Sequence, residues 1–225
     1  MHPLAKHESF ECEVLDKMQK GGFLRPLVFG GGTMLRLCHD LPRYSVDLDF
    51  WFCRRVSYEK YHEKLKLWLK NLYEITDSKN KHYTLLYELR KKGFERKLKL
   101  EIRKEMIKKG VEEKIAFSPH ATGQVLLQTL SLQETIKRKL AAIGSRHEIR
   151  DYYDLEFLLR KGVEVRLNEQ SRQALHDGLQ LFRKTDYSVT LGSLLDEDLR
   201  NYHTEHGLSY LSTFVLDTNK VKKLR

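Results

Sequence analysis

Residues 28–52 read VFGGGTMLRLCHDLPRYSVDLDFWF, and this stretch decides how the rest of the chain is interpreted. An apolar run, which we expect to be a strand from Pro26 to Phe29, ends in three glycines that lead into a short helical pattern. A loop at Pro42 follows, and residues 45–52 then alternate as a strand does. Glycines before a helix N-terminus suit a phosphate, and two aspartates on one strand suit a divalent metal. Together they indicate nucleotide chemistry.

Asp47 and Asp49 are predicted to project from the same face of their strand, because successive side chains alternate. Two carboxylates that close repel each other unless a cation lies between them. Mg²⁺, or alternatively Mn²⁺, accepts few carboxylates and completes its shell with water and substrate phosphates. We therefore predict a metal site here, with solvated loop carboxylates as the structural alternative. The residues of the other face can anchor the strand in a core: Val46, Leu48, Phe50 and Phe52.

A third carboxylate on a neighbouring strand would complete a two-metal site for nucleotidyl transfer. Residues 82–90 and 94–103 both alternate, and residues 91–93 (KKG) between them predict a hairpin turn. Glu101 lies on the polar face of the second strand and is our choice of third ligand, while Glu88 competes on the same argument.

The glycine run is the weaker of the two signals. The backbone amides of Gly31, Gly32 and Thr33 can cradle a phosphate at the start of the helix, with Thr33 as its expected N-cap. The run matches neither GxxxxGK(S/T) nor GxGxxG. A bare triple glycine is most often a tight turn, so its functional interpretation depends on the aspartates that follow.

Composition narrows the class of protein. The 225 residues include 41 Lys and Arg against 31 Asp and Glu, a net charge of +10, which predicts attraction to nucleic acid or to an acidic membrane surface. No apolar run approaches the ~20 residues that span a bilayer, and the N-terminus lacks a signal-peptide core. Three cysteines without a CxxC pair predict neither a disulfide framework nor a zinc ribbon. We therefore expect a reduced, cytoplasmic protein without a membrane partner.

Basic residues concentrate around the predicted hairpin. Such a run is usually a solvated face, but this one adjoins the strand that carries Glu101 and can guide a phosphate backbone towards the metal site. Its members are Arg90, Lys91, Lys92, Arg96, Lys97, Lys99, Arg103, Lys104, Lys108 and Lys109.

The chain is expected to be an α+β protein of two domains. Residues 7–19 and 57–75 have helical spacing, and together with the predicted strands they indicate a mixed β-sheet flanked by helices over residues 1–122. From about residue 124 apolar residues fall at helical spacing, which predicts a C-terminal α-helical bundle over residues 123–225.

Two separated blocks of this sequence resemble the AbiEii/AbiGii toxin family, a branch of the DNA polymerase β-like nucleotidyltransferases. The first block is Gly31-Gly32-Thr33 followed by Arg43-x-Ser45-x-Asp47-x-Asp49-Phe50. The second is Glu134-x-x-x-x-Lys139-Leu140-x-Ala142, then Arg146 and Arg150-Asp151-x-x-Asp154-Leu155. The resemblance covers residues 27–52 and 126–159 well and the remainder by organisation only.

The resemblance gives the second block a function. From the residues alone, Glu134, Arg138 and Lys139 form a solvated charged face, and Arg150 and Asp154 form an i,i+4 pair that staples a helix. The resemblance instead implies that Lys139 binds the triphosphate of an NTP. It also implies that Asp151 acts as a base or orients Lys139 or Arg150. In this interpretation Arg43, Ser45 and Arg150 also contact the nucleotide.

The resemblance further implies what the protein acts on. Members of this family are commonly toxins of toxin–antitoxin or abortive-infection systems, and some relatives add nucleotides to the 3′ end of tRNA. The expected function is therefore metal-dependent transfer of NMP to an RNA hydroxyl, with a cognate antitoxin as partner. The alternatives are protein nucleotidylation, a kinase-like transfer, or a non-catalytic module that binds RNA or an antitoxin.

Overall fold

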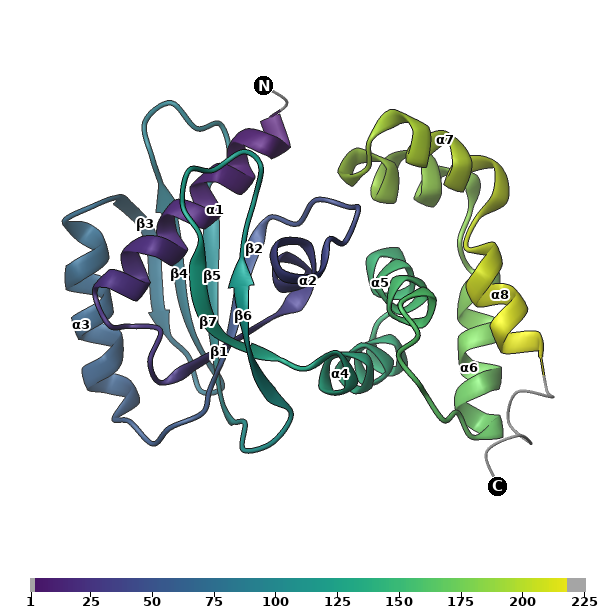
Figure 1. Ribbon diagram of the computed structural model, residues 1–225, viewed down its shortest axis with the longest axis horizontal. Coiled ribbons are helices and arrows are strands. Elements are labelled where there is room, and N and C mark those ends of the chain that lie inside the picture. The colour runs from purple at the N-terminus through teal and green to yellow at the C-terminus, as the bar shows by residue number, and fades with distance from the viewer. Residues whose placement is uncertain (1–2, 218–225) are drawn as a thin grey trace. The chain divides into compact units, whose positions relative to one another are not determined.

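The computed structural model describes residues 3–217, which belong to two compact units (Figure 1). The first unit is Met1–Ser131 and the second is Leu132–Arg225. No helix in the described part of the chain is long and apolar enough to cross a membrane.

The first unit is a seven-stranded mixed sheet with three helices. The strands are ordered β3-β4-β5-β2-β1-β7-β6, with β2 parallel to β5 and β1 parallel to β7. The other neighbouring pairs are antiparallel. Its elements in chain order are α1 (Pro3–Lys20), β1 (Leu27–Gly30), α2 (Gly31–His39), β2 (Asp47–Phe52), α3 (Tyr58–Lys70), β3 (Glu74–Asn80), β4 (Thr84–Arg90), β5 (Leu98–Met106), β6 (Val111–Ala116) and β7 (Val125–Leu130).

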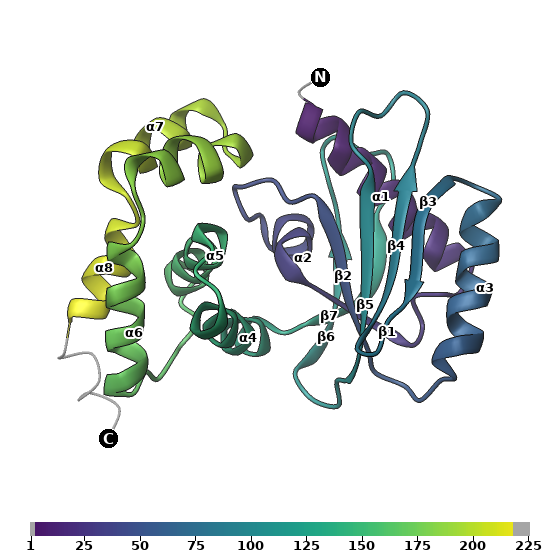
Figure 2. The same ribbon diagram turned by 180° about the vertical axis from the view of Figure 1, so that it is seen from behind.

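One face of the central strands is apolar and carries the core of this unit. Helix α1 crosses this face in Figure 1, and the view from behind in Figure 2 shows β2, β4 and β5 on the near side of it. Helix α3 packs on the same face, where the ring of His62 stacks on Tyr87 and Tyr61 meets Phe52 edge-on. Alternation therefore leaves the polar residues of these strands on the opposite face. The buried residues of the apolar face are Leu48, Phe50, Phe52, Leu85, Tyr87, Leu89, Leu98, Leu100 and Ile102.

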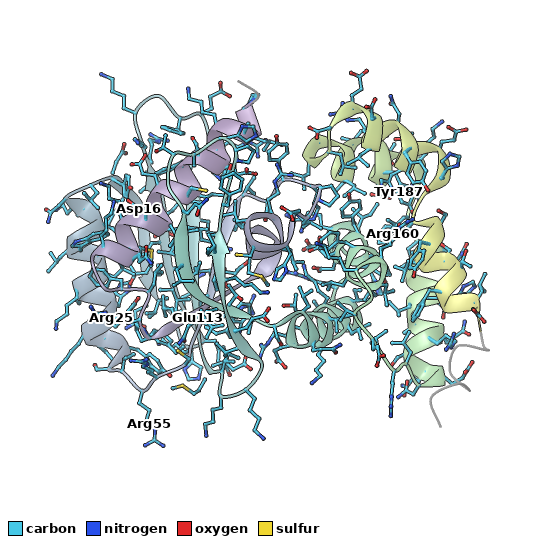
Figure 3. All side chains as sticks on the ribbon, in the orientation of Figure 1. Asp16, Arg25, Arg55, Glu113, Arg160 and Tyr187 are labelled. Carbon is cyan, nitrogen blue, oxygen red and sulfur yellow. The ribbon has the colours of Figure 1, made fainter. Side chains whose placement is uncertain are left out.

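The second unit is entirely helical over its described residues. Buried polar contacts join its helices: the Glu156 carboxylate of α5 accepts a hydrogen bond from the Leu211 amide of α8 at 2.9 Å. Arg160, labelled in Figure 3, pairs with Glu156 and lies over the Tyr210 ring. Its elements are α4 (Leu132–Ser145), α5 (Ile149–Arg160), α6 (Glu169–Gln180), a π-helical turn (Asp186–Leu191), a 3-10 turn (Gly192–Leu194), α7 (Glu197–His206) and α8 (Ser209–Leu216).

The expected α+β fold, with a mixed sheet and C-terminal helices, is confirmed. The predicted hairpin is the antiparallel pair β4–β5, in which Leu89 lies opposite Leu98. The predicted strands around Phe29 and Asp49 are β1 and β2, and the first predicted helix is α1.

Residues 125–130 form strand β7, although their apolar spacing predicted that they belong to the helical region. The spacing of their apolar residues is compatible with a helix or with a strand. Pairing with β1 on one side and with β6 on the other makes this segment a strand. Residues 123–131 consequently lie in the first unit, so the two units divide after Ser131 rather than after residue 122.

The second predicted helix was also too long. Helix α3 ends at Lys70, and Glu74 already begins β3, which pairs with β4. Within α3, the side chain of Leu67 is 64% exposed, whereas that of Leu65 is fully buried.

These two leucines of α3 provide a matched test of the core. Replacing Leu65 by Ala should lower the free energy of unfolding by about 2–5 kcal/mol, because it leaves a cavity beneath the helix. The same change at Leu67 should stay within about 0.5 kcal/mol, since that side chain is largely in solvent. Urea unfolding of both variants measures the difference, and equal losses would contradict this position of the core.

Candidate active site

Asp47 and Asp49 lie at the start of β2 and share its polar face. Both are half-buried, while Leu48 between them is fully buried on the apolar face. The predicted arrangement of the two carboxylates on one face of a strand is therefore observed.

Strand β5 brings a third carboxylate beside this pair. In the parallel register of β2 and β5, Asp49 lies opposite Glu101 and Asp47 lies opposite Lys99. Glu88 lies one strand further away on β4, where Lys97 pairs with its carboxylate. The register therefore favours Glu101 over Glu88 as the third carboxylate of this face.

Two cations of β5 contact Glu101. The Lys99 ammonium lies 2.7 Å from Oε2, and the Arg103 guanidinium lies 3.9 Å from Oε1. Burial acts to lower the pKa of Lys99, but the hydrogen bond to Glu101 and the charges of Glu101, Asp47 and Asp49 raise this pKa above its ordinary value. The polar face thus combines three carboxylates with two cationic side chains.

The glycine run brings backbone into direct contact with this face. Gly31 has a φ of +76°, and a methyl group there would lie 2.4 Å from Oδ2 of Asp49. A methyl group on Gly32 would lie 2.5 Å from the Arg43 guanidinium and 2.8 Å from the Ser45 hydroxyl. Helix α2 therefore begins against the side chains that the sequence analysis grouped around a phosphate.

Thr33 does not cap helix α2, so the predicted N-cap was wrong. The N-cap residue is Gly30, which has no side chain, and Thr33 lies inside the first turn. The Thr33 hydroxyl is buried and donates to the backbone carbonyl of Asp47 at 2.6 Å. Its side chain thereby fixes the first residue of β2.

Helix α1 supports the same strand from the apolar side, which sequence reasoning missed. His7 Nε2 donates to the Val46 carbonyl at 3.0 Å, and Glu11 accepts from Thr33 at 3.4 Å. Burial, followed by the charges of Glu8 and Asp47, raises the pKa of Glu11 well above its ordinary value. A detectable signal existed, because His7 and Glu11 occupy the same helical stripe as the apolar residues of α1.

In the second unit, Lys139 lies between two buried carboxylates. Its ammonium is 2.9 Å from Oδ1 of Asp151 and 2.5 Å from Oδ2 of Asp154. Arg146 binds the other oxygen of Asp151 at 2.9 Å. The exposed fractions of Asp151 and Asp154 are 2% and 0%, so both carboxylates depend on these cations.

Arg150 makes a different contact from those expected of it. Its guanidinium donates to Glu148 at 2.6 Å, while Asp154 contacts Lys139 instead of forming the expected pair with Arg150. Asp151 thus contacts Lys139 and Arg146, while Arg150 contacts Glu148.

The polar face of β2 fits a divalent metal by its donor chemistry. Within residues 3–217, no group of three His, Cys, Asp or Glu side chains is gathered closely enough to hold a metal ion. Mg²⁺ needs only one or two carboxylates when phosphates supply the remaining oxygens. Asp47 and Asp49 meet that requirement, and Glu101 is within the same register but bound to Lys99.

A mixed sheet with two co-facing aspartates beside a glycine-led helix is the arrangement of a nucleotidyltransferase. The family model described as "Nucleotidyl transferase AbiEii toxin, Type IV TA system" matches residues 13–214. The chain therefore belongs to the AbiEii family of nucleotidyltransferase toxins, which confirms the resemblance found in the sequence.

Two solved structures from Helicobacter pylori share this fold at low sequence identity. JHP933 from Helicobacter pylori is 23% identical with a TM-score of 0.65, covering 99% of this chain and 95% of that one. A second H. pylori structure is 21% identical with a TM-score of 0.63, and the match covers 100% of this chain and 99% of that one. MenT4, a nucleotidyltransferase toxin from Mycobacterium tuberculosis H37Rv, is 16% identical with a TM-score of 0.48, covering 93% and 88%. No curated protein sequence matches the chain significantly.

Replacement of Gly31 by Ala tests the contact between α2 and Asp49. Gly93 also has a positive φ, of +86°, but no atom lies within 4 Å of a methyl group placed there. Each alanine should cost about 1–2 kcal/mol of unfolding free energy from backbone strain. Gly31→Ala should cost at least about 1 kcal/mol more, because Asp49 must move. Equal losses in urea unfolding would contradict the contact.

Glu11→Gln tests the buried carboxyl of α1. Because the folded-state pKa of Glu11 is raised, its contribution to stability is complete below the ordinary pKa of a glutamate and is lost as pH rises. Glutamine does not ionise, so the stability of Glu11→Gln relative to wild type should increase between pH 5 and pH 8. Glu8→Gln is the control and should be destabilised by about 1–3 kcal/mol, because it weakens the 2.7 Å pair with Arg36. Unfolding curves across this pH range measure both effects, and a pH-independent Glu11→Gln difference would contradict the assignment.

Proposed function

We propose that this toxin transfers NMP from an NTP to a hydroxyl of RNA, with the 3′ end of tRNA as acceptor and Mg²⁺ or Mn²⁺ as cofactor. The observation that carries the proposal is the polar face of β2. There Asp47 and Asp49 lie together, Glu101 is in register with Asp49, and Gly31 lies against the Asp49 carboxylate. Asp47 and Asp49 would hold the metal, which would neutralise the triphosphate as it reacts.

The start of α2 is suited to hold the triphosphate. The backbone amides of Gly31, Gly32 and Thr33 are at a helix N-terminus, where an anion is favoured. The Ser45 hydroxyl and the Arg43 guanidinium flank Gly32 and would add a hydrogen bond and a positive charge. The acceptor hydroxyl would attack the α-phosphorus and lose its proton to a carboxylate of the site, while the bond to the β-phosphate breaks and pyrophosphate leaves.

Lys139 is proposed as a further cation for the triphosphate, with Arg150 as a second phosphate contact. The positions of both Asp151 and Asp154 support a fixed place for the Lys139 ammonium. Both oxygens of Asp151 are bound by cations, which favours an orienting role for Asp151 over that of a base.

The choice of RNA rests on charge. The net charge is +10, Lys99 and Arg103 lie on β5 with Glu101, and Lys97 directly precedes this strand. A phosphate backbone would find its counter-charge there. The family description names a type IV toxin–antitoxin system, so we propose a cognate antitoxin as the protein partner and the cytoplasm as the place of action.

The proposal predicts that Asp47→Asn and Asp49→Asn each lower transfer by roughly 10³-fold or more while the fold is kept, since each removes a metal ligand and its charge. Asp77→Asn is the control, because Asp77 lies on the edge strand β3 and pairs with Lys79. The measurement uses each NTP labelled at the α-phosphate, with total tRNA or protein extract as acceptor.

Each other result of this assay has a definite meaning. Near-normal transfer by both asparagine variants would overturn the metal site. Label in protein alone would replace RNA by a protein acceptor, and transfer of a γ-phosphate label in place of the α-label would indicate a kinase-like reaction. Tight RNA binding without any transfer would identify a binding module.

A further inference from the structure

Lys99 lies among the carboxylates of the proposed metal site. In the β2–β5 register it is opposite Asp47, and two residues further along the same strand Glu101 is opposite Asp49. Lys99 and Glu101 therefore share the polar face with both aspartates. The family motifs in the sequence assign this lysine no role, and the proposed function gives it only a share in the positive charge that attracts RNA.

The Glu101 carboxylate is contacted by two cations of its own strand. Lys99 is 2.7 Å from one carboxylate oxygen of Glu101, and Arg103 is 3.9 Å from the other. Glu101 cannot offer its Oε2 to a metal ion while the Lys99 ammonium is bound to it. The Lys99 side chain is 45% exposed, so it has solvent into which it can move.

An ordinary surface ion pair is the alternative explanation, and the chain contains one with the same geometry. Lys79 and Asp77 are also two residues apart on a strand, and their charged atoms are 2.8 Å apart. That pair lies on the edge strand β3, away from β2. Lys99 differs by its place in the sheet, because it lies opposite Asp47 and its partner Glu101 lies opposite Asp49.

We propose that Lys99 is a resident counter-cation of the Asp47–Asp49–Glu101 cluster, and that a divalent metal must displace it to bind there. This inference rests on the proposed metal site. If Lys99 occupies the site, a divalent metal should bind weakly to the nucleotide-free protein. The reason is that the Lys99 ammonium and the metal would repel each other within one site. A triphosphate offers the displaced ammonium a new partner, so metal and nucleotide should each strengthen the binding of the other.

Lys99→Met tests this directly, with Mn²⁺ binding to the nucleotide-free protein measured by electron paramagnetic resonance of the free ion. We expect Lys99→Met to bind Mn²⁺ about tenfold or more tightly than the wild type, because one positive charge is removed from the site. Lys99→Arg retains the charge and should bind as weakly as the wild type. Lys79→Met is the matched control and should leave Mn²⁺ affinity unchanged.

Thermal unfolding gives a second readout that does not depend on catalysis. In EDTA, Lys99→Met should melt below the wild type, because the carboxylates lose their counter-charge. Added Mn²⁺ should raise its melting temperature more than that of the wild type. Lys79→Met should show no such extra response to metal.

Asp47→Asn separates a failure of this inference from a failure of the proposed function. If Asp47→Asn loses Mn²⁺ binding while Lys99→Met binds no more tightly than wild type, the metal site stands and the role of Lys99 is overturned. If Mn²⁺ binding survives in Asp47→Asn, the metal lies elsewhere, and both the proposed site and this inference are overturned.

Discussion

The parallel pairing of β2 with β5 is the constraint on which the polar face of the sheet depends. Leu48 lies opposite Leu100 and Phe50 opposite Ile102, and these buried residues hold the register. Because side chains alternate, the same register places Asp49 beside Glu101 on the other face. A slip of one residue would move the carboxylates into the apolar core, so burial on one face specifies the charge cluster on the other.

Helices α1 and α2 also hold the backbone at the start of β2 by side-chain hydrogen bonds. Thr33 of α2 donates to the Asp47 carbonyl, and His7 of α1 donates to the Val46 carbonyl. These bonds fix the backbone from which the Asp47 carboxylate projects on the polar face. Backbone held by buried hydrogen bonds keeps a reactive side chain in place better than a surface loop can, which explains why α1 carries polar residues in an otherwise apolar stripe.

Local pattern was sufficient to predict the hairpin β4–β5, the shared face of Asp47 and Asp49, and the class of fold. It failed where the outcome depends on distant pairing. The segment 125–130 suits a helix or a strand until β1 and β6 lie beside it, and the choice between Glu101 and Glu88 needs the order β4-β5-β2. Thr33 was misassigned because the N-cap position depends on where α2 begins, which Gly30 decides. The family motif predicted roles for Lys139 and Asp151, whereas the hydrogen bond of Arg146 to Asp151 could be found only in the structure.

The two units each hold a lysine against carboxylates, and burial makes the two lysines differ in kind. Lys139 is 12% exposed and lies between Asp151 and Asp154, both of them buried. Removing this ammonium from its site would leave two desolvated carboxylates, so it is a fixed charge. Lys99 is 45% exposed, and the Glu101 side chain that it contacts is 18% exposed. Water can solvate both partners when they separate, so this ammonium can be exchanged for another cation at modest cost. The same pairing of lysine with carboxylate therefore provides a permanent positive charge in the second unit and a replaceable one in the first.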